Sequence, residues 1–379
     1  MNYLLLGTIL DHSAFTSDLA ANPASTKWLS GFVGGLHDNG DKVSLCGHCY
    51  ARAWPRGALF PGKREYLDHN YDNHLVRFIN VPGVRYGSMG RGYYRSGCVA
   101  SQDCNPDLIV TYNPYPWHVS AARRLRRKLN IPWVCLNLDF DEVGEDWKCF
   151  LRVAGDADAH LFLSHWGYLN APVENKINLD SGVSHLAPEF GANSNRETIN
   201  LVYLGSLSDS AGLKVLLALP DLIQNENVRF IYGGKGYPEV NSRLLDLEKS
   251  DSRVDFRGFV DDREMKALFD QADIFLNPRD PMQVINDMVF PSKIMHYLQT
   301  GKTVVSTWTR GLEECYRDLM IIAEEPSVED YSKAVSRAIS ESHQDRTLRA
   351  NLIKDFLLES RLWSKQAERF SDFCKVISR

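Results

Sequence analysis

Residues 272–306, ADIFLNPRDPMQVINDMVFPSKIMHYLQTGKTVVS, decide the fold of this chain. Two short apolar runs in this stretch, residues 274–276 and 304–305, are typical of buried strands. Between them lie a polar loop and a segment whose apolar residues have helical spacing and which ends at Gly301. A proline near the first turn and a glycine just past the last are the usual limits of a helix. The pattern predicts strand, loop, helix and strand, as in a parallel sheet.

Polar side chains gather at the loop and at the start of the predicted helix. They are Asn286, Asp287, Ser292 and Lys293. Free N–H groups and the positive end of the helix dipole attract anions there, and Lys293 adds a full positive charge. We therefore predict a pocket for a phosphorylated ligand at the carboxyl edge of the sheet. The alternative is an ordinary surface helix with a solvated lysine.

The length of 379 residues favours two domains. Two successive series of alternating strands and helices predict two doubly wound parallel sheets, an α/β architecture. A polar, glycine-bearing segment at residues 188–196 is the expected linker. It gives an N-terminal domain at residues 1–193, a second domain at residues 194–358 and a final helix at residues 359–379. In the first domain we expect strands at residues 3–8, 42–45, 75–79, 108–112, 133–138 and 160–163, and a helix at residues 25–37.

The composition is that of a soluble globular protein, with 44% apolar and 24% charged residues. A net charge of −5 argues against a nucleic-acid binder. The first apolar run, residues 3–10, is too short to span a membrane, so we expect a cytoplasmic protein. Cys46 and Cys49 form a CxxC pair, but a zinc site would need a second pair at short range. We therefore expect no metal.

Two further stretches have compositions that suit a partner. Residues 84–97 combine glycines with arginine and tyrosine, which predicts a mobile substrate loop or a plain surface loop. Residues 118–130 form a predicted helix with five basic side chains. It would contact an anionic lipid surface and make the protein peripheral at the cytoplasmic face of the membrane, or its charges would form a solvated face.

Several motifs, taken in order, resemble a known family. They are Gly205-Ser-Leu, Gly234-Lys-Gly, Arg257-Gly-Phe-Val, Gln271-Ala-Asp-Ile-Phe-Leu-Asn-Pro, Phe290-Pro-Ser-Lys and Gly301-Lys-Thr-Val-Val. Together they are similar to the donor-binding domain of GT-B glycosyltransferases of the family-4 type. The resemblance implies a nucleotide-sugar donor in the second domain and a glycan or lipid-linked acceptor on the first. It also implies retention of anomeric configuration, no metal or other cofactor, and a C-terminal helix that crosses back to the first domain.

The resemblance also assigns site residues. It places Gly205, Ser206, Ser292 and Lys293 at the donor diphosphate, and the segment from Arg257 to Val260 near the base. Asn286 and Asp287 belong to the same loop and helix start, and Lys235 is a candidate second cation.

The chain departs from the family pattern at four positions. Ser206 and Ala211 stand where members commonly carry arginine and lysine, which removes two diphosphate cations. The pair of acidic residues spaced eight apart is replaced by Met288 and His296. We interpret His296 as a ligand of a sugar hydroxyl or of phosphate, or else as a filler on the buried face of its helix.

Two aspartates follow the predicted strand at residues 133–138. Asp139 or Asp141 would contact the acceptor or act as a general base, in which case the configuration would invert. Asp139 alternatively caps the following segment. The function predicted from the sequence is glycosyl transfer in surface polysaccharide, lipopolysaccharide or exopolysaccharide assembly, the alternative being a degenerate non-catalytic partner of another protein. A nicotinamide dehydrogenase is excluded, because no GxGxxG follows the first predicted strand.

Overall fold

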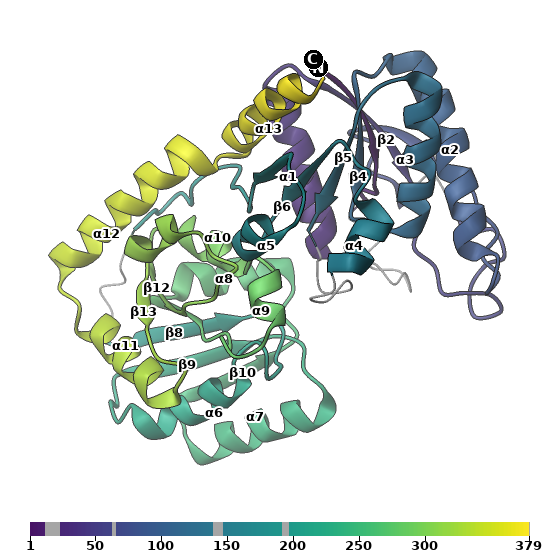
Figure 1. Cartoon of the computed structure of the whole chain (residues 1–379). Helices are drawn as coiled ribbons and strands as arrows, with labels where there is room; N and C mark the ends of the chain where they lie inside the picture. The colour runs from purple at the N-terminus through teal and green to yellow at the C-terminus, as the bar shows by residue number, and fades with distance from the viewer. Residues whose placement is uncertain (12–22, 63–65, 139–146, 192–196, 379) are drawn as a thin grey trace. The chain divides into compact units, whose positions relative to one another are not determined.

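The computed structural model describes residues 1–11, 23–62, 66–138, 147–191 and 197–378 (Figure 1). These residues form two compact units. The first comprises Met1–Leu163, Gly167–Gly182 and Leu362–Arg379, and the second comprises Ser164–Trp166 and Val183–Arg361. The boundaries expected from the sequence lay at residues 193 and 358, and the units divide after Gly182 and after Arg361.

The first unit is built on a sheet of seven parallel strands in the order β3-β2-β1-β4-β5-β6-β7. The strands are β1 (Asn2–Leu6), β2 (Lys42–Gly47), β3 (Asp72–Leu75), β4 (Leu108–Tyr112), β5 (Trp133–Asn137), β6 (Ala159–Phe162) and β7 (Lys176–Asn178). Every residue of β4, β5 and β6 is buried, as expected for strands covered on both faces. The sequence missed β7, which is too short to show a pattern.

Helices cover both faces of this sheet. They are α1 (Pro23–Asp38), α2 (Arg85–Cys104), α3 (Pro116–Leu129), α4 (Trp147–Ala154), α13 (Trp363–Ile377) and α5 (His165–Asn170), which spans the border between the units. Figure 1 shows α2 and α3 on one side of the sheet and α1 and α13 on the other. The expected return of the C-terminal helix to the first unit is thus observed.

Two glycines of α1 let α13 approach closely. A Cβ atom at Gly31 would lie 2.2 Å from Nε1 of Trp363, and one at Gly35 would lie 2.2 Å from the carbonyl oxygen of Trp363. The edge of the Trp363 ring also meets Trp28, with centroids 5.5 Å apart. Larger residues at either glycine would push the two helices apart, so both positions serve packing.

The prediction of a loop at residues 84–97 is wrong, because this stretch is part of helix α2. Its glycines serve close contact. A Cβ atom at Gly92 would lie 2.4 Å from the carbonyl oxygen of Arg77, and one at Gly97 would lie 2.7 Å from Cδ1 of Leu125 on α3. Tyr93 between them is fully buried. Tertiary packing overrides the poor helix propensity of glycine here.

The basic helix predicted at residues 118–130 is α3, and several of its charges have intramolecular partners. Arg123 forms an ion pair with Asp156 at 2.7 Å, and Arg126 forms one with Asp158. The guanidinium of Arg124 lies 3.8 Å from the ring centroid of Tyr94. Contact of α3 with a lipid surface stays a prediction. Among the described helices, none combines the length and the apolar character that a membrane span needs.

Three histidines are buried in the first unit, and burial lowers the pKa of each. The pKa falls to about 3 for His48 and to about 4 for His118 and His160. His48 and His118 have hydrogen-bond partners, Tyr93 Oη at 2.6 Å and the carbonyl oxygen of Tyr112 at 2.7 Å. Neither ring nitrogen of His160 has a partner among the described residues. These rings are therefore neutral at pH 7.

Replacing His160 with phenylalanine is expected to flatten the acid sensitivity of the first unit. The unfolded chain binds more protons than the folded one below pH ~6.5, so each such histidine lowers the unfolding free energy by about 1.4 kcal/mol per pH unit as the pH falls towards its folded pKa. His160 packs between Phe150 and Phe162, at centroid distances of 5.3 and 6.0 Å. Thermal unfolding at pH 7.5 and 5.0 should show the variant gaining about 2 kcal/mol over wild type on acidification. An unchanged pH dependence would contradict the assignment.

The second unit is built on six parallel strands in the order β10-β9-β8-β11-β12-β13. The strands are β8 (Ile199–Leu204), β9 (Val228–Gly233), β10 (Val254–Gly258), β11 (Ile274–Asn277), β12 (Thr303–Thr307) and β13 (Ile321–Ala323). The strands predicted within residues 272–306 are confirmed as β11 and β12, which pair with Ile274 opposite Thr303. Strand order reverses between β8 and β11, so a ligand crevice is expected at their carboxyl ends.

The helices of this unit alternate with its strands. They are α6 (Leu213–Leu222), α7 (Pro238–Ser250), α8 (Asp262–Gln271), α9 (Ile285–Met288), α10 (Lys293–Leu298), η4 (Glu314–Leu319), α11 (Val328–Ser340), α12 (His343–Phe356) and η5 (Leu357–Arg361). Figure 1 shows α6 and α7 on one side of the sheet and α8 and α10 on the other. Both predicted doubly wound sheets are thus confirmed.

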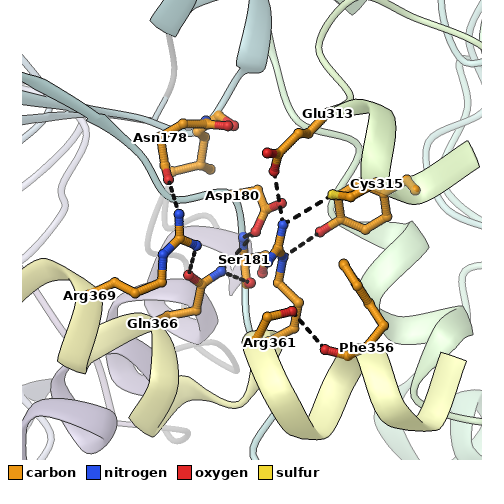
Figure 2. A network of polar contacts seen from close by, with 12 residues as sticks. Asn178, Asp180, Ser181, Glu313, Cys315, Phe356, Arg361, Gln366 and Arg369 are labelled. Carbon is orange, nitrogen blue, oxygen red and sulfur yellow. Dashed lines mark hydrogen bonds and ion pairs between the residues drawn. The ribbon is translucent and has the colours of Figure 1, made fainter. Parts of the chain in front are cut away.

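A buried arginine fixes the end of the second unit (Figure 2). Arg361 is 4% exposed and donates to the hydroxyl of Tyr316 at 3.1 Å and to Glu313 at 3.0 Å. In the first unit, Gln366 donates to Asp180 at 2.9 Å. Each unit therefore holds its own part of the connecting chain through side-chain hydrogen bonds.

Candidate functional site

A pocket of about 330 Å³ lies at the carboxyl edge of the second sheet. We call it the glycine pocket. It is lined by Leu204, Gly205, Ser206, Gly233, Gly234, Lys235, Phe259, Val260, Met265, Phe269, Lys293, His296 and Tyr297. Six of these are predicted site residues, namely Gly205, Ser206, Lys235, Val260, Lys293 and His296. Segments far apart in sequence thus meet at the edge where the sheet topology predicts a ligand.

Two glycines make the wall of this pocket possible. Gly205 and Gly234 have φ values of 149° and 156°, a region that side chains strongly disfavour. A Cβ atom at Gly234 would lie 1.6 Å from the carbonyl oxygen of Gly205, and one at Gly205 would lie 2.4 Å from Nζ of Lys293. The loops after β8 and β9 therefore touch backbone to backbone, and the lysine side chain passes directly over Gly205.

Lys293 is held against the ring of Tyr203. Its Nζ donates to Tyr203 Oη at 2.8 Å and lies 4.2 Å from the ring centroid. The hydroxyl of Tyr203 donates in turn to the carbonyl oxygen of Ser206 at 2.5 Å. Burial, and then the nearby charge of Arg279, lower the pKa of Lys293 to about 7. A bound anion would favour the charged form of this lysine.

The rest of the pocket offers one more polar group and an apolar wall. His296 lies one turn after Lys293 on α10 and is exposed, so the interpretation of His296 as a filler on a buried helix face is wrong. Phe259 is 76% exposed and lines the pocket with Val260, Met265 and Phe269. Such a wall suits a flat ring, because aromatic and apolar side chains stack on ring faces.

Two predicted residues lie near the glycine pocket without lining it. Arg257 pairs with Asp255 at 2.6 Å and approaches Glu264 at 3.9 Å, so its charge has partners on its own loop and on α8. Ser292 precedes α10 and is exposed, and its side chain does not cap that helix. Ligand contact for both residues stays a prediction.

Asn286 and Asp287 on α9 serve the fold. The amide of Asn286 donates to the carbonyl oxygens of Ser210 at 2.7 Å and Asp280 at 2.8 Å. The buried carboxylate of Asp287 accepts from the backbone N–H of Arg310 at 3.0 Å and from its guanidinium at 2.5 Å. Both side chains therefore hold loops that surround the carboxyl edge, and their contact with a ligand stays a prediction.

Asp139 and Asp141 lie outside the described residues. The described part of this segment ends at Leu138, whose N–H donates to the side chain of Asn113 at 2.8 Å. The role of either aspartate as a base or acceptor contact stays a prediction.

Neither cysteine of the CxxC pair behaves as an exposed thiolate. Cys46 lies in β2, and burial raises the pKa of its thiol well above the ordinary value. Cys49 is also buried. A reactive or metal-binding thiol requires the opposite shift. Within the part of the chain that the structure describes, no three histidine, cysteine or acidic side chains gather as metal ligands would.

Sequence reasoning missed Arg279, which comes two residues after β11. It lines a cavity of about 570 Å³ that we call the Arg279 cavity. The cavity is lined by Asp209, Gly212, Lys214, Val215, Pro278, Arg279, Asp280, Pro281, Met282, Gln283, Thr307, Pro326, Ser327, Val328 and Glu329. The signal was present in the sequence, because a cation directly after a central parallel strand faces the ligand edge of the sheet.

The second unit matches a known family in sequence. Residues 198–341 match the model of the family described as Glycosyl transferases group 1. One of the chains that make up the phosphatidylinositol N-acetylglucosaminyltransferase of Arabidopsis thaliana is 28% identical over 149 residues, which are 38% of this chain and 32% of that protein. The chain thus spans about a third of the length of this curated relative.

Solved structures match over the whole chain. Sucrose-phosphate synthase from Thermosynechococcus elongatus has a TM-score of 0.68 at 12% identity, covering 100% of this chain and 99% of that one. HepE from Anabaena, solved in complex with UDP, has a TM-score of 0.68 at 13% identity, covering 99% of this chain and 100% of that one. The chain therefore has the GT-B fold, and its second unit belongs to the glycosyl transferases group 1 family.

Proposed function

We propose that this chain is a glycosyltransferase that moves a sugar from a nucleotide-diphosphate donor to a glycan or lipid-linked acceptor. The observation that carries the proposal is the glycine pocket, which lies within the residues that match the family and brings Lys293 beside two glycine loops. HepE, which has the same fold, was solved as a complex with UDP. The name of the Arabidopsis relative describes N-acetylglucosamine transfer to phosphatidylinositol.

The chemistry of the pocket suits such a donor. Phe259, Val260 and Met265 offer an apolar surface to a base, and Lys293 lines the same pocket. In glycosyl transfer the leaving group is a nucleoside diphosphate, so negative charge develops on the phosphate as the sugar departs. A preorganised ammonium group stabilises that charge without a metal ion. We assign Lys293 to this role, and His296 to a sugar hydroxyl or to phosphate.

The stereochemical course and the acceptor side belong to the same proposal. We propose retention of anomeric configuration and an acceptor on the first unit. Asp139 or Asp141 acting as a general base would instead give inversion. We place the reaction in surface polysaccharide or lipopolysaccharide assembly at the cytoplasmic face of a membrane, where α3 offers basic side chains to anionic headgroups.

A second candidate function is that of a non-catalytic partner in a larger enzyme. Ser206 and Ala211 favour it, because they replace the arginine and lysine that family members commonly carry. Fold alone does not decide between these functions, since catalysis depends on particular side chains.

Donor turnover tests the proposal. The chain would be incubated with UDP-, GDP-, TDP- and CMP-sugars, and the released nucleotide measured over hours. We expect slow release from one nucleoside-diphosphate sugar by hydrolysis, because water replaces the missing acceptor. Binding would be measured in parallel by calorimetry. Neither release nor binding for any donor of the panel would contradict the enzyme and favour the non-catalytic partner.

A further inference from the structure

Arg279 occupies the point where the order of the second sheet reverses. It follows β11, and β11 is the neighbour of β8, whose loop begins at Gly205. The two loops touch, because a Cβ atom at Gly212 would lie 1.8 Å from the carbonyl oxygen of Pro278. Arg279 therefore stands beside residues 205–212, in the crevice that α/β sheets of this kind use for ligands.

The guanidinium of Arg279 is buried and only partly satisfied. One terminal nitrogen donates to Oδ1 of Asn286 at 2.6 Å. Its Nε is buried and has no hydrogen-bond partner among the described residues. Burial lowers the pKa of this arginine, and no carboxylate of the described chain forms an ion pair with it. A buried cation in this state is costly unless an anion joins it.

A second cation lies close by in the same state. The charge of Arg279 contributes to the low pKa of Lys293, so the two groups repel each other. Lys293 hydrogen-bonds the neutral hydroxyl of Tyr203, and it too has no carboxylate partner within the described ranges. Two unpaired cations on either side of one loop destabilise the empty protein. An anion that bridges them would relieve this repulsion.

We propose that Arg279 is the second diphosphate-binding cation of this chain, replacing the cations that Ser206 and Ala211 do not supply. The inference rests on the proposed function. Lys293 lines the glycine pocket and Arg279 lines the neighbouring cavity. The nucleoside-side phosphate therefore contacts Lys293, and the sugar-side phosphate contacts Arg279.

The surroundings of Arg279 support this direction. Asn286 accepts from Arg279 and at the same time donates to the carbonyl oxygen of Ser210, so it fixes the guanidinium relative to the loop after β8. Asp209, Asp280 and Glu329 also line the Arg279 cavity. Carboxylates accept hydrogen bonds from sugar hydroxyls, which suits the sugar end of the donor.

The test compares ligands that differ by one phosphate. Calorimetric titrations of the whole chain would use UDP, GDP, ADP and dTDP, the corresponding monophosphates, and inorganic pyrophosphate. For the base that wild type binds, Arg279→Gln should weaken diphosphate binding at least tenfold and monophosphate binding less than twofold. Arg279→Lys should recover part of the loss, because it restores the charge without the planar donor pair.

A purely structural Arg279 gives a different result. If it only supported the loop through Asn286, Arg279→Gln would weaken diphosphate and monophosphate equally and lower the melting temperature. That outcome, or unchanged diphosphate binding, would overturn the inference and leave the proposed function standing. If wild type bound none of these nucleotides, the proposed function would fail, and the inference with it. Asn286→Ala separates the two roles, since it removes the support and keeps the cation.

Discussion

Replacing Lys293 with alanine is expected to lower donor affinity or turnover at least tenfold, since one charged contact to phosphate contributes roughly 1.5–3 kcal/mol. The ammonium group lies over Gly205 and against Tyr203, so no other side chain of the glycine pocket can take its place without moving the loop. Calorimetric titration of the donor and the rate of nucleotide release both measure the effect. Donor binding equal to that of wild type would remove Lys293 from the site.

The low pKa of Lys293 adds a pH dependence with a definite sign. Free Lys293 is mostly neutral above pH 7, its folded pKa being about 7. Because the unfolded chain keeps this proton to a higher pH, the empty protein gains stability as the pH rises above 7. A diphosphate requires the charged form, so binding takes up a proton and weakens by up to about tenfold per pH unit above pH 7.

The matched variant for this dependence is Lys293→Arg. Arginine stays charged throughout this range, so its binding curve should be flat between pH 7 and 9 even if its affinity is lower. Titrations in buffers of different ionisation enthalpy count the protons taken up. A wild-type curve as flat as that of the arginine variant would contradict the assignment.

Replacing Gly234 with alanine is expected to destabilise the second unit by more than about 3 kcal/mol and to abolish donor binding. The new Cβ atom would lie 1.6 Å from the carbonyl oxygen of Gly205, at a φ of 156°. The atom it meets is backbone, so a rotamer change cannot relieve the clash, and the loops after β8 and β9 must separate. Thermal unfolding followed by circular dichroism measures the loss.

Gly258 supplies the control. It also has a positive φ, 61°, but a Cβ atom there meets nothing within 4 Å. Gly258→Ala should therefore cost only the conformational penalty of about 1–2 kcal/mol. Equal destabilisation by the two variants would show that φ alone, and not the contact between the loops, decides the cost.

Local patterns in the sequence predicted most of the sheet framework. The runs at residues 274–276 and 304–305 became adjacent strands because buried parallel strands are apolar throughout. Helix α2 was missed for the opposite reason. Its glycines read as a loop, and only the approach of Leu125 and of the carbonyl oxygen of Arg77 explains why small residues stand there. Such contacts join distant parts of the chain and leave no local pattern.

The candidate site divides in the same way. Gly205, Ser206, Lys293 and His296 were predicted, and the structure brings them together in one pocket. Tyr203, which receives the hydrogen bond of Lys293, lies 90 residues away in sequence and could not be paired with it beforehand. Asn286 and Asp287 had the right chemistry for a ligand, but their polar atoms hold neighbouring loops. Residue type predicts the chemistry a side chain can perform, and packing decides which partner it meets.

Hydrogen–deuterium exchange with and without a saturating nucleoside diphosphate tests most directly that the glycine pocket is the donor site. Binding should slow amide exchange in the loops at residues 205–207, 233–236 and 258–260, which surround the pocket. The first unit should change little, because the nucleotide alone engages the second. Protection absent from these three loops, with nucleotide binding demonstrated by calorimetry, would contradict the account.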